Sequence, residues 1–248
     1  MSNILMQFAA KTAAAAGGFD VENDITWKHL WWASSSVNSG YSDTDPVGTW
    51  YASVGEDVTQ GTGNYQPTFV ASATNLNNQK ALDFDGGNDR YTHTFSAAPS
   101  YTSGVTWVMI VDGDATAGVN MHLMTGTSTS TENRTRVADG TQLWQIEAGN
   151  GNQDGTTTYA TGGHLITSFF DGSTGNDIMI LDGTTEISAD AGSEQVTGIN
   201  IAANAAGTGS HWNGRIALIG CYEGRFDLDS EYSNFKTWVG SYYGITVA

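Results

Sequence analysis

Residues 105–111 read VTWVMIV, an apolar run interrupted by one polar residue, Thr106. Successive side chains of a β-strand point to opposite faces of the sheet. A strand that is apolar at consecutive positions therefore has to be covered on both faces. The run predicts a central strand of a sheet, with other parts of the chain packed above and below it.

Short candidate strands, apolar or alternating, recur on both sides of this stretch, separated by polar, glycine-rich gaps. They lie at 25–32, 90–95, 121–124, 143–146, 165–170, 178–181, 185–188, 199–201 and 216–222. The pair Asp182-Gly183 between two of them indicates a two-residue hairpin turn, because both positions of such a turn need positive φ. The 31 glycines and three prolines suit many tight turns. This pattern is typical of an all-β sandwich or barrel.

One helix is predicted near the end of the sequence, over Asp229–Tyr243. The carboxylate of Asp229 can accept hydrogen bonds from the exposed backbone N–H groups of the first turn. One helical face then carries the apolar side chains of Tyr232, Phe235, Val239 and Tyr242. Gly244 follows where a left-handed cap is favoured. This helix is expected to lie across an edge or end of the sandwich.

The first 18 residues, MSNILMQFAAKTAAAAGG, differ in composition from the rest. They lack a basic region at the start, and Lys11 interrupts the apolar stretch that a signal peptide needs, so none is predicted. We expect an N-terminal arm over 1–18 and one domain over 19–248. The candidate assembly contacts of the arm are its apolar side chains Ile4, Leu5, Met6 and Phe8.

The charge balance limits the partners of the protein. Nine Lys and Arg against 26 Asp and Glu give a net charge of −17. Binding to phosphate needs clustered basic residues, so nucleic acid and anionic membranes are not expected partners. No apolar run is long enough to cross a membrane. The single cysteine, Cys221, lies in an apolar run and is expected to be a buried, inert thiol.

Several short motifs follow one another along the chain: LWWA at 30–33, GTW at 48–50, QPTF at 66–69, ALDFDGGND at 81–89, WNGRIA at 212–217 and YYGI at 242–245. Together they resemble the concanavalin A-like lectin/glucanase family (laminin G-like), of the kind found in bacteriophage virion proteins. Their order and spacing are similar to those of the family from Trp27 to Ile245. The resemblance implies a two-sheet antiparallel jelly-roll sandwich with one C-terminal helix. The family includes lectins, glucanases, adhesion modules and virion proteins, so fold alone does not choose the function.

Glycoside hydrolysis requires two carboxylates that flank the scissile bond. Glucanases of this fold carry an E-x-D-x-x-E strand motif, and the sequence has none. The nearest cluster of acidic residues comprises Glu223, Asp227, Asp229 and Glu231. These acidic groups lie at the start of the predicted helix, where they favour the helix dipole. No catalytic residue is predicted, and the protein is expected not to be an enzyme.

No cofactor or metal motif is complete. Asp43-Thr44-Asp45, and 83–85 with 88–89, supply oxygen groups that calcium could use, yet neither has the full spacing of a calcium loop. Asp and Asn are also ordinary turn residues. No pair among the five histidines has zinc spacing, and these are His29, His93, His122, His164 and His211. Satisfied, partly buried histidines are expected instead.

Sugar binding would need exposed aromatic rings beside amide and carboxylate groups. Trp31, Trp144 and Trp212 are the candidate glycan contacts, with core packing as the alternative for each. Trp31 and Trp32 are adjacent, so in a strand they face opposite ways.

Three functional hypotheses remain open. The first is a non-enzymatic bacteriophage virion protein, such as a capsid decoration protein, assembled in the host cytoplasm through contacts with other virion proteins or copies of itself. The second is a carbohydrate-binding or receptor-recognition module with a surface glycan as partner. The third, a glycoside hydrolase, lacks the paired carboxylates.

Overall fold

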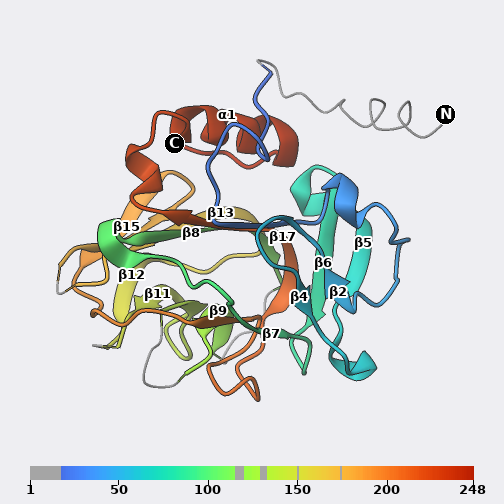
Figure 1. Ribbon diagram of the computed structural model, residues 1–248, viewed down its shortest axis with the longest axis horizontal. Helices are drawn as coiled ribbons and strands as arrows, with labels where there is room; N and C mark the ends of the chain where they lie inside the picture. Colours follow the sequence, from blue (N-terminus) through green and yellow to red (C-terminus); the bar gives the residue numbers. More distant parts are fainter. Residues whose placement is uncertain (1–17, 115–119, 129–132, 150, 174) are drawn as a thin grey trace.

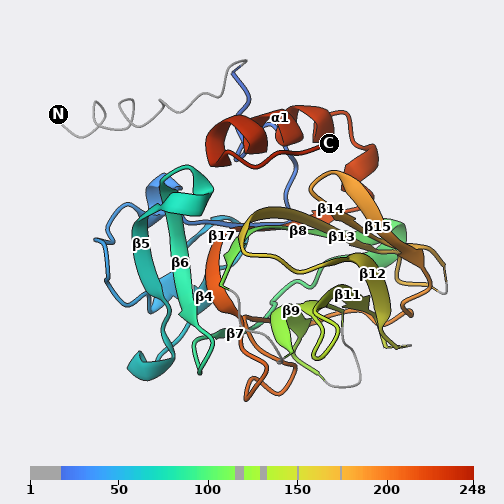
Figure 2. The same ribbon diagram turned by 180° about the vertical axis from the view of Figure 1, so that it is seen from behind.

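The computed structural model describes residues 18–114, 120–128, 133–149, 151–173 and 175–248. In these ranges the chain is built of three layers: a helix, a large sheet beneath it and a smaller sheet below that (Figures 1 and 2). All strand pairs are antiparallel. The predicted two-sheet jelly-roll sandwich with one C-terminal helix is confirmed.

The larger sheet has nine strands within the described ranges. Its main path is β15 (Thr184–Ala189), β14 (Asp177–Leu181), β13 (Gly162–Phe170), β8 (Val105–Gly113), β17 (Asn213–Glu223), β1 (His29–Trp32) and β3 (Ala52–Val54). Strands β6 (Gln79–Asp85) and β5 (Thr68–Ala73) continue from the first part of β17. The 11-residue β17 thus pairs with β8 on one side, while β1 and β6 share its other side.

The smaller sheet has six strands in the same ranges. Their order is β12 (Gln153–Thr158), β11 (Leu143–Glu147), β10 (Arg134–Val137), β9 (Met121–Gly126), β16 (Gly198–Ile201) and β7 (Tyr91–Thr94). A two-stranded ladder joins β2 (Thr49–Trp50) to β4 (Val58–Thr59). Short 3-10 turns are η1 (Ser36–Asn38), η2 (Gly63–Tyr65), η3 (Thr74–Leu76), η4 (Tyr101–Ser103) and η5 (Phe226–Leu228).

Strand β8 lies at the centre of the molecule, as its apolar run predicts. All its residues are buried, and it pairs with β13 and β17 along its length. Trp107 and Met109 belong to the core between the two sheets, whereas Val108 and Ile110 belong to the core beneath the helix. Burying each such large apolar side chain contributes about 1.5–3 kcal/mol. The alternation of β8 therefore joins the two cores.

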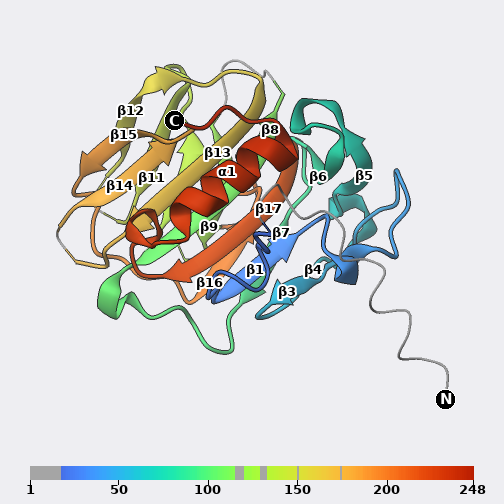
Figure 3. The ribbon, with the colours of Figure 1, turned by 90° about the horizontal axis from the view of Figure 1, so that it is seen from above.

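The helix α1 (Tyr232–Tyr243) lies across the outer face of the nine-stranded sheet (Figure 3). It begins three residues later than the sequence predicts, because Asp229 ends the preceding 3-10 turn η5. Asp229 accepts hydrogen bonds from the Glu231 N–H at 2.8 Å and the Tyr222 hydroxyl at 2.7 Å. Gly244 adopts the predicted left-handed conformation, with φ of 72°.

Two further local predictions are confirmed. Asp182 and Gly183 have φ of 50° and 85°, and Leu181 pairs with Thr184 across the turn. Cys221 is fully buried on β17, and burial raises the pKa of its thiol well above the ordinary value.

The predicted arm lies outside the described residues, apart from Gly18. The same is true of the candidate assembly contacts Ile4, Leu5, Met6 and Phe8, so the arm and the domain boundary stay predictions. No helix in the described ranges is long and apolar enough to cross a membrane.

Candidate functional site

The three tryptophans proposed as glycan contacts lie in the core between the sheets. Trp31, Trp144 and Trp212 have no exposed surface. The rings of Trp144 and Trp212 are 6.4 Å apart, and Tyr159 packs edge-on against both. A ring without exposed surface cannot stack on a sugar, so this assignment is corrected: these side chains pack the core.

The acidic loops considered for calcium are engaged with the backbone. Oδ1 of Asp43 accepts from the Ala71 N–H at 2.9 Å, and Oδ2 of Asp45 accepts from the Ser42 N–H at 2.8 Å. Oδ1 of Asp85 accepts from Gly87 at 2.7 Å. Among the residues the structure describes, no cluster of three or more His, Cys, Asp or Glu could hold a metal ion. Calcium binding stays an untested prediction.

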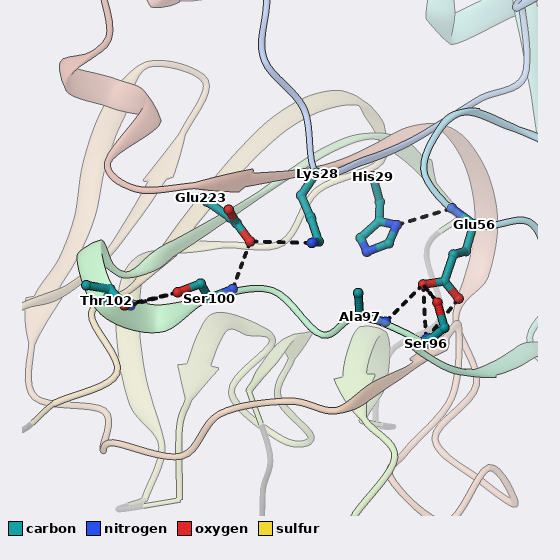
Figure 4. Close-up of polar contacts among 8 residues, drawn as sticks. All are labelled: Lys28, His29, Glu56, Ser96, Ala97, Ser100, Thr102 and Glu223. Carbon is teal, nitrogen blue, oxygen red and sulfur yellow. Dashed lines mark hydrogen bonds and ion pairs between the residues drawn. The ribbon is translucent and has the colours of Figure 1, made fainter.

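The acidic cluster before the helix has structural partners. Glu223 accepts from the Ser100 N–H at 2.9 Å and lies 3.7 Å from the Lys28 amine (Figure 4). Asp227 forms an ion pair with Arg225. These contacts fix the segment that leads from β17 into α1.

Glu56 is the most heavily bonded carboxylate near the same edge (Figure 4). It accepts from the Ser96 N–H at 3.0 Å, the Ser96 hydroxyl at 2.9 Å and the Ala97 N–H at 3.4 Å. His93 lies 3.0 Å from its other oxygen, and the Glu56 N–H donates to His29 at 3.3 Å. This cluster ties the turn after β3 to the segment after β7, so it is a structural anchor.

A different set of polar groups gathers on the outer face of the six-stranded sheet. The hydroxyl of Thr135 donates to Ser168 of the nine-stranded sheet at 2.9 Å, so Thr135 points inward. Because strand side chains alternate, Arg134 and Arg136 point outward. Trp144 lies in the core by the same alternation, which places its neighbour Gln145 on the outer face.

One row of side chains crosses four neighbouring strands on this face. Arg136 of β10 pairs with His122 of β9 and with Gln145 of β11, and Gln145 pairs with Asp154 of β12. Nε of Arg136 donates to Oε1 of Gln145 at 2.8 Å, and its Nη1 lies 3.5 Å from Nε2 of His122. The Gln145 amide donates in turn to Asp154. The row is therefore one linked chain of hydrogen-bonding groups.

A second row runs beside the first. Arg134 pairs with Thr125 of β9 and Glu147 of β11, and its guanidinium forms an ion pair with Glu147. Asn152 joins the rows, because its Oδ1 accepts from Arg134 at 3.0 Å and from Arg136 at 2.9 Å. We call the two rows with Asn152 the polar platform; its members are Thr125, His122, Arg134, Arg136, Gln145, Glu147, Asn152 and Asp154.

One side of the polar platform is covered and the other is open. The segment 202–211 lies against β9, where the His122 N–H donates to the Ser210 carbonyl at 2.9 Å and the Thr125 hydroxyl donates to the Ala203 carbonyl at 3.1 Å (Figure 1). His122 is 2% exposed and Arg136 9%, whereas Asn152 and Asp154 are exposed. Burial and the charges of Arg136 and Arg134 lower the pKa of His122 to about 3. The imidazole is therefore neutral at physiological pH.

Chemically, the open side of the polar platform offers guanidinium donors, the Asn152 amide and carboxylates on a rigid sheet, while the His122 imidazole is covered. A polyhydroxylated ligand needs donors and acceptors together, and this set provides both. Sites on strands are held more rigidly than sites on loops. The arrangement suits recognition of a polar ligand at the open side of the platform, over β10 to β12.

The sequence analysis missed this site because its members look like ordinary outward positions of strands. The available signal was Arg134-Thr135-Arg136, which places two of only nine basic residues on the same side of one strand. That spacing alone does not reveal the partners on β9, β11 and β12, because strand register brings them together.

No family model and no curated protein matches the sequence. Solved structures share its fold. Trypanosoma rangeli sialidase in complex with sialic acid aligns with a TM-score of 0.55 at 10% identity, covering 85% of this chain and 32% of that one. The same sialidase with the inhibitor DANA aligns with a TM-score of 0.50 at 12% identity. This chain thus spans about a third of the length of the sialidase chain.

Domain 4 of an extracellular arabinanase from Geobacillus stearothermophilus, in complex with arabinotriose, is also similar. It aligns with a TM-score of 0.48 at 13% identity, covering 80% of this chain and 92% of that domain. Likeness at such low identity concerns the fold alone.

Proposed function

We propose that this protein is a non-catalytic carbohydrate-binding module that binds a glycan on the polar platform. The observation that carries the proposal is the open end of the platform, where Asn152 and Asp154 are exposed and Arg134 is partly exposed. Hydrogen bonds to the buried Arg136 and Gln145 hold these groups in place. Ligand sites join a few convergent polar groups on a pre-formed surface. The hydroxyl groups of a sugar can form hydrogen bonds with these exposed groups while the buried part of the network keeps its internal bonds.

The fold comparison supports the proposal at a coarse level. A sialidase whose chain includes a segment of similar fold was solved in complex with sialic acid, and this chain aligns with 32% of that enzyme. For the hydrolase hypothesis, the acidic residues before α1 offer no support, since Glu223 and Asp227 are engaged in fixing the chain. Binding without catalysis is the function that the site supports best.

The test is glycan-array screening of the purified protein, followed by calorimetry with the best ligand. We expect Arg136→Gln and Asp154→Ala to weaken binding about 10- to 100-fold, since a hydrogen bond to a charged group contributes about 1.5–3 kcal/mol. Lys236→Gln is the matched control, because Lys236 is a partly exposed basic residue on α1, which covers the opposite side of the nine-stranded sheet. Melting curves check that each variant is folded.

An array without binding would contradict the proposal. Equal loss of binding in the Lys236→Gln control would also count against it, because the platform would then have no special role.

The virion hypothesis expects loops and edges of the sandwich to contact neighbouring proteins, with the N-terminal arm adding contact area. The arm lies outside the described residues, apart from Gly18, and the hypothesis stays a prediction. Its test is co-sedimentation of the protein with virus particles. Carbohydrate binding has the better support, because a sialidase with a segment of similar fold was solved in complex with sialic acid.

A further inference from the structure

Two guanidinium groups converge on a single oxygen atom at the open side of the polar platform. Oδ1 of Asn152 accepts from Nη2 of Arg134 at 3.0 Å and from Nη2 of Arg136 at 2.9 Å. The arginines lie two residues apart on β10, so their side chains leave the same face of the strand. The position of this oxygen marks a point that both cations can reach at once.

A neutral amide oxygen is a weak occupant for that point. A carboxylate oxygen carries negative charge and an amide oxygen does not, so a guanidinium group binds the carboxylate more strongly, and its planar fork matches planar oxyanions. Asn152 is exposed and lies before β12, so its side chain can turn away from the arginines into solvent. Glu147 holds Arg134 from the other side and keeps the guanidinium in place.

The electrostatics of the neighbouring residues agree with this geometry. After burial, the charges of Arg136 and Arg134 are the largest influences that lower the pKa of His122. The arginines thus make the surroundings of that imidazole positive, although the chain as a whole carries a net charge of −17. The carboxylates of Glu147 and Asp154 lie on the same face, so the attraction of an anionic group depends on its direct contact with the two guanidinium groups.

We infer that Arg134 and Arg136 form an oxyanion subsite of the polar platform, and that it takes the carboxylate or sulfate group of an acidic sugar residue. In the free protein, the amide oxygen of Asn152 fills the subsite; in the complex, an oxygen of the ligand replaces it. The inference rests on the proposed function and names its ligand class: glycans that carry a negative charge.

The experiment compares three probes by calorimetry at low and moderate salt. They are a galacturonic acid oligosaccharide, the galactose oligosaccharide of equal length, and a sulfated form of the latter. We expect an acidic probe to bind at least about tenfold more tightly than the neutral one. Higher salt is expected to reduce this preference, since the subsite is partly open to solvent. The carboxylated and sulfated arms distinguish which oxyanion is preferred.

Variants at Asn152 give the sharper test, because the side chain is exposed and its loss leaves the core untouched. Asn152→Ala removes the competing oxygen and is expected to tighten binding of the acidic probe. Asn152→Asp places a tethered carboxylate between the arginines and is expected to weaken it. Arg134→Gln is expected to abolish the preference for acidic over neutral probe, with melting curves as the folding check.

Failure of the oxyanion subsite and failure of the proposed function give different experimental results. If neutral and acidic probes bind equally well to the wild-type protein, the oxyanion subsite is overturned while carbohydrate binding stands. Opposite or absent effects of Asn152→Ala and Asn152→Asp on the acidic probe also overturn the subsite. If no glycan binds on the array or by calorimetry, both the subsite and the proposed function are overturned.

Discussion

Glu56 shows how one side chain can connect parts of the chain that are distant in sequence. Its carboxylate accepts from Ser96 and Ala97 and contacts His93, while its backbone carbonyl accepts from the Trp31 indole at 2.8 Å. Burial by itself raises the pKa of Glu56, but these hydrogen bonds outweigh it and lower the pKa from 4.5 to about 2. The folded protein therefore favours the ionised carboxylate.

We expect Glu56→Gln to destabilise the protein by about 1.5–3 kcal/mol, because charge-assisted hydrogen bonds are lost. Since the pKa of Glu56 is lower in the folded than in the unfolded state, its contribution is complete above pH 4.5 and is lost as pH falls toward about 2. Denaturant unfolding of wild type and variant at several pH values checks this.

The gap in free energy of unfolding between the two proteins should therefore shrink as pH falls below 4.5. Glu231→Gln is a suitable control, since the Glu231 side chain accepts only one described hydrogen bond, from the exposed Asn234. A gap that does not change with pH would show that the carboxylate charge of Glu56 is not what stabilises the fold.

Side-chain exposure is the property of single residues that the sequence predicted least well. Trp31 and Trp32 follow each other in β1, yet Trp31 is fully buried and Trp32 is partly exposed beside α1. Alternation predicts that they face opposite ways, and this holds. Which face of a strand is buried depends on the element that packs against it, and this is known only once the layers are assembled.

At the level of elements, the β14–β15 hairpin illustrates a feature that local sequence specifies well. Asp182 and Gly183 both adopt positive φ, as Asp-Gly pairs commonly do in such turns. The tertiary structure adds a constraint that the pair alone does not show. A Cβ atom on Gly183 would lie 2.3 Å from the carbonyl oxygen of Ala248 and 2.7 Å from its nitrogen.

We expect Gly183→Ala to destabilise the protein by more than Gly140→Ala. Both glycines have positive φ, 85° and 74°, so each alanine pays about 1–2 kcal/mol for the left-handed backbone. Only at Gly183 does the new methyl group also meet backbone atoms, since a Cβ on Gly140 has no neighbour within 4 Å. Thermal unfolding measures the difference; equal losses would rule out the close approach of Ala248.

The start of the helix shows the limit of local signals at this scale. Asp229 carries the acidic group that favours a helix start, but its two oxygens are used by Tyr222 and by the Glu231 N–H. The hydroxyl of Tyr222 reaches Asp229 because β17 ends next to the turn. The first helical turn is displaced by a contact between elements, while Gly244 ends the helix through its own conformation.

For the whole molecule, Cys221 serves as a reporter of global unfolding. It lies on β17 opposite His29 of β1 and Trp107 of β8, and it has no exposed surface. We expect a thiol reagent to label the folded protein at least about a thousandfold more slowly than a free thiol, since native stability is typically 5–15 kcal/mol.

Labelling should follow the cooperative unfolding transition in denaturant, as measured by mass spectrometry alongside tryptophan fluorescence. Fast labelling in buffer would show that β17 opens locally, which the central position of the strand in the nine-stranded sheet does not predict.

The sequence by itself determined the strands with apolar runs, the hairpin turn and the closing helix of this protein, while the resemblance to a known family implied the two-sheet architecture. Apolar runs such as residues 105–111 and the turn at Asp182-Gly183 act through neighbours in the chain, so their pattern can be read locally. The polar platform was decided only by the tertiary structure. Its residues come from four strands and acquire partners through antiparallel register. An outward-facing Arg136 or Gln145 looks like any surface residue until the neighbouring strands are in place.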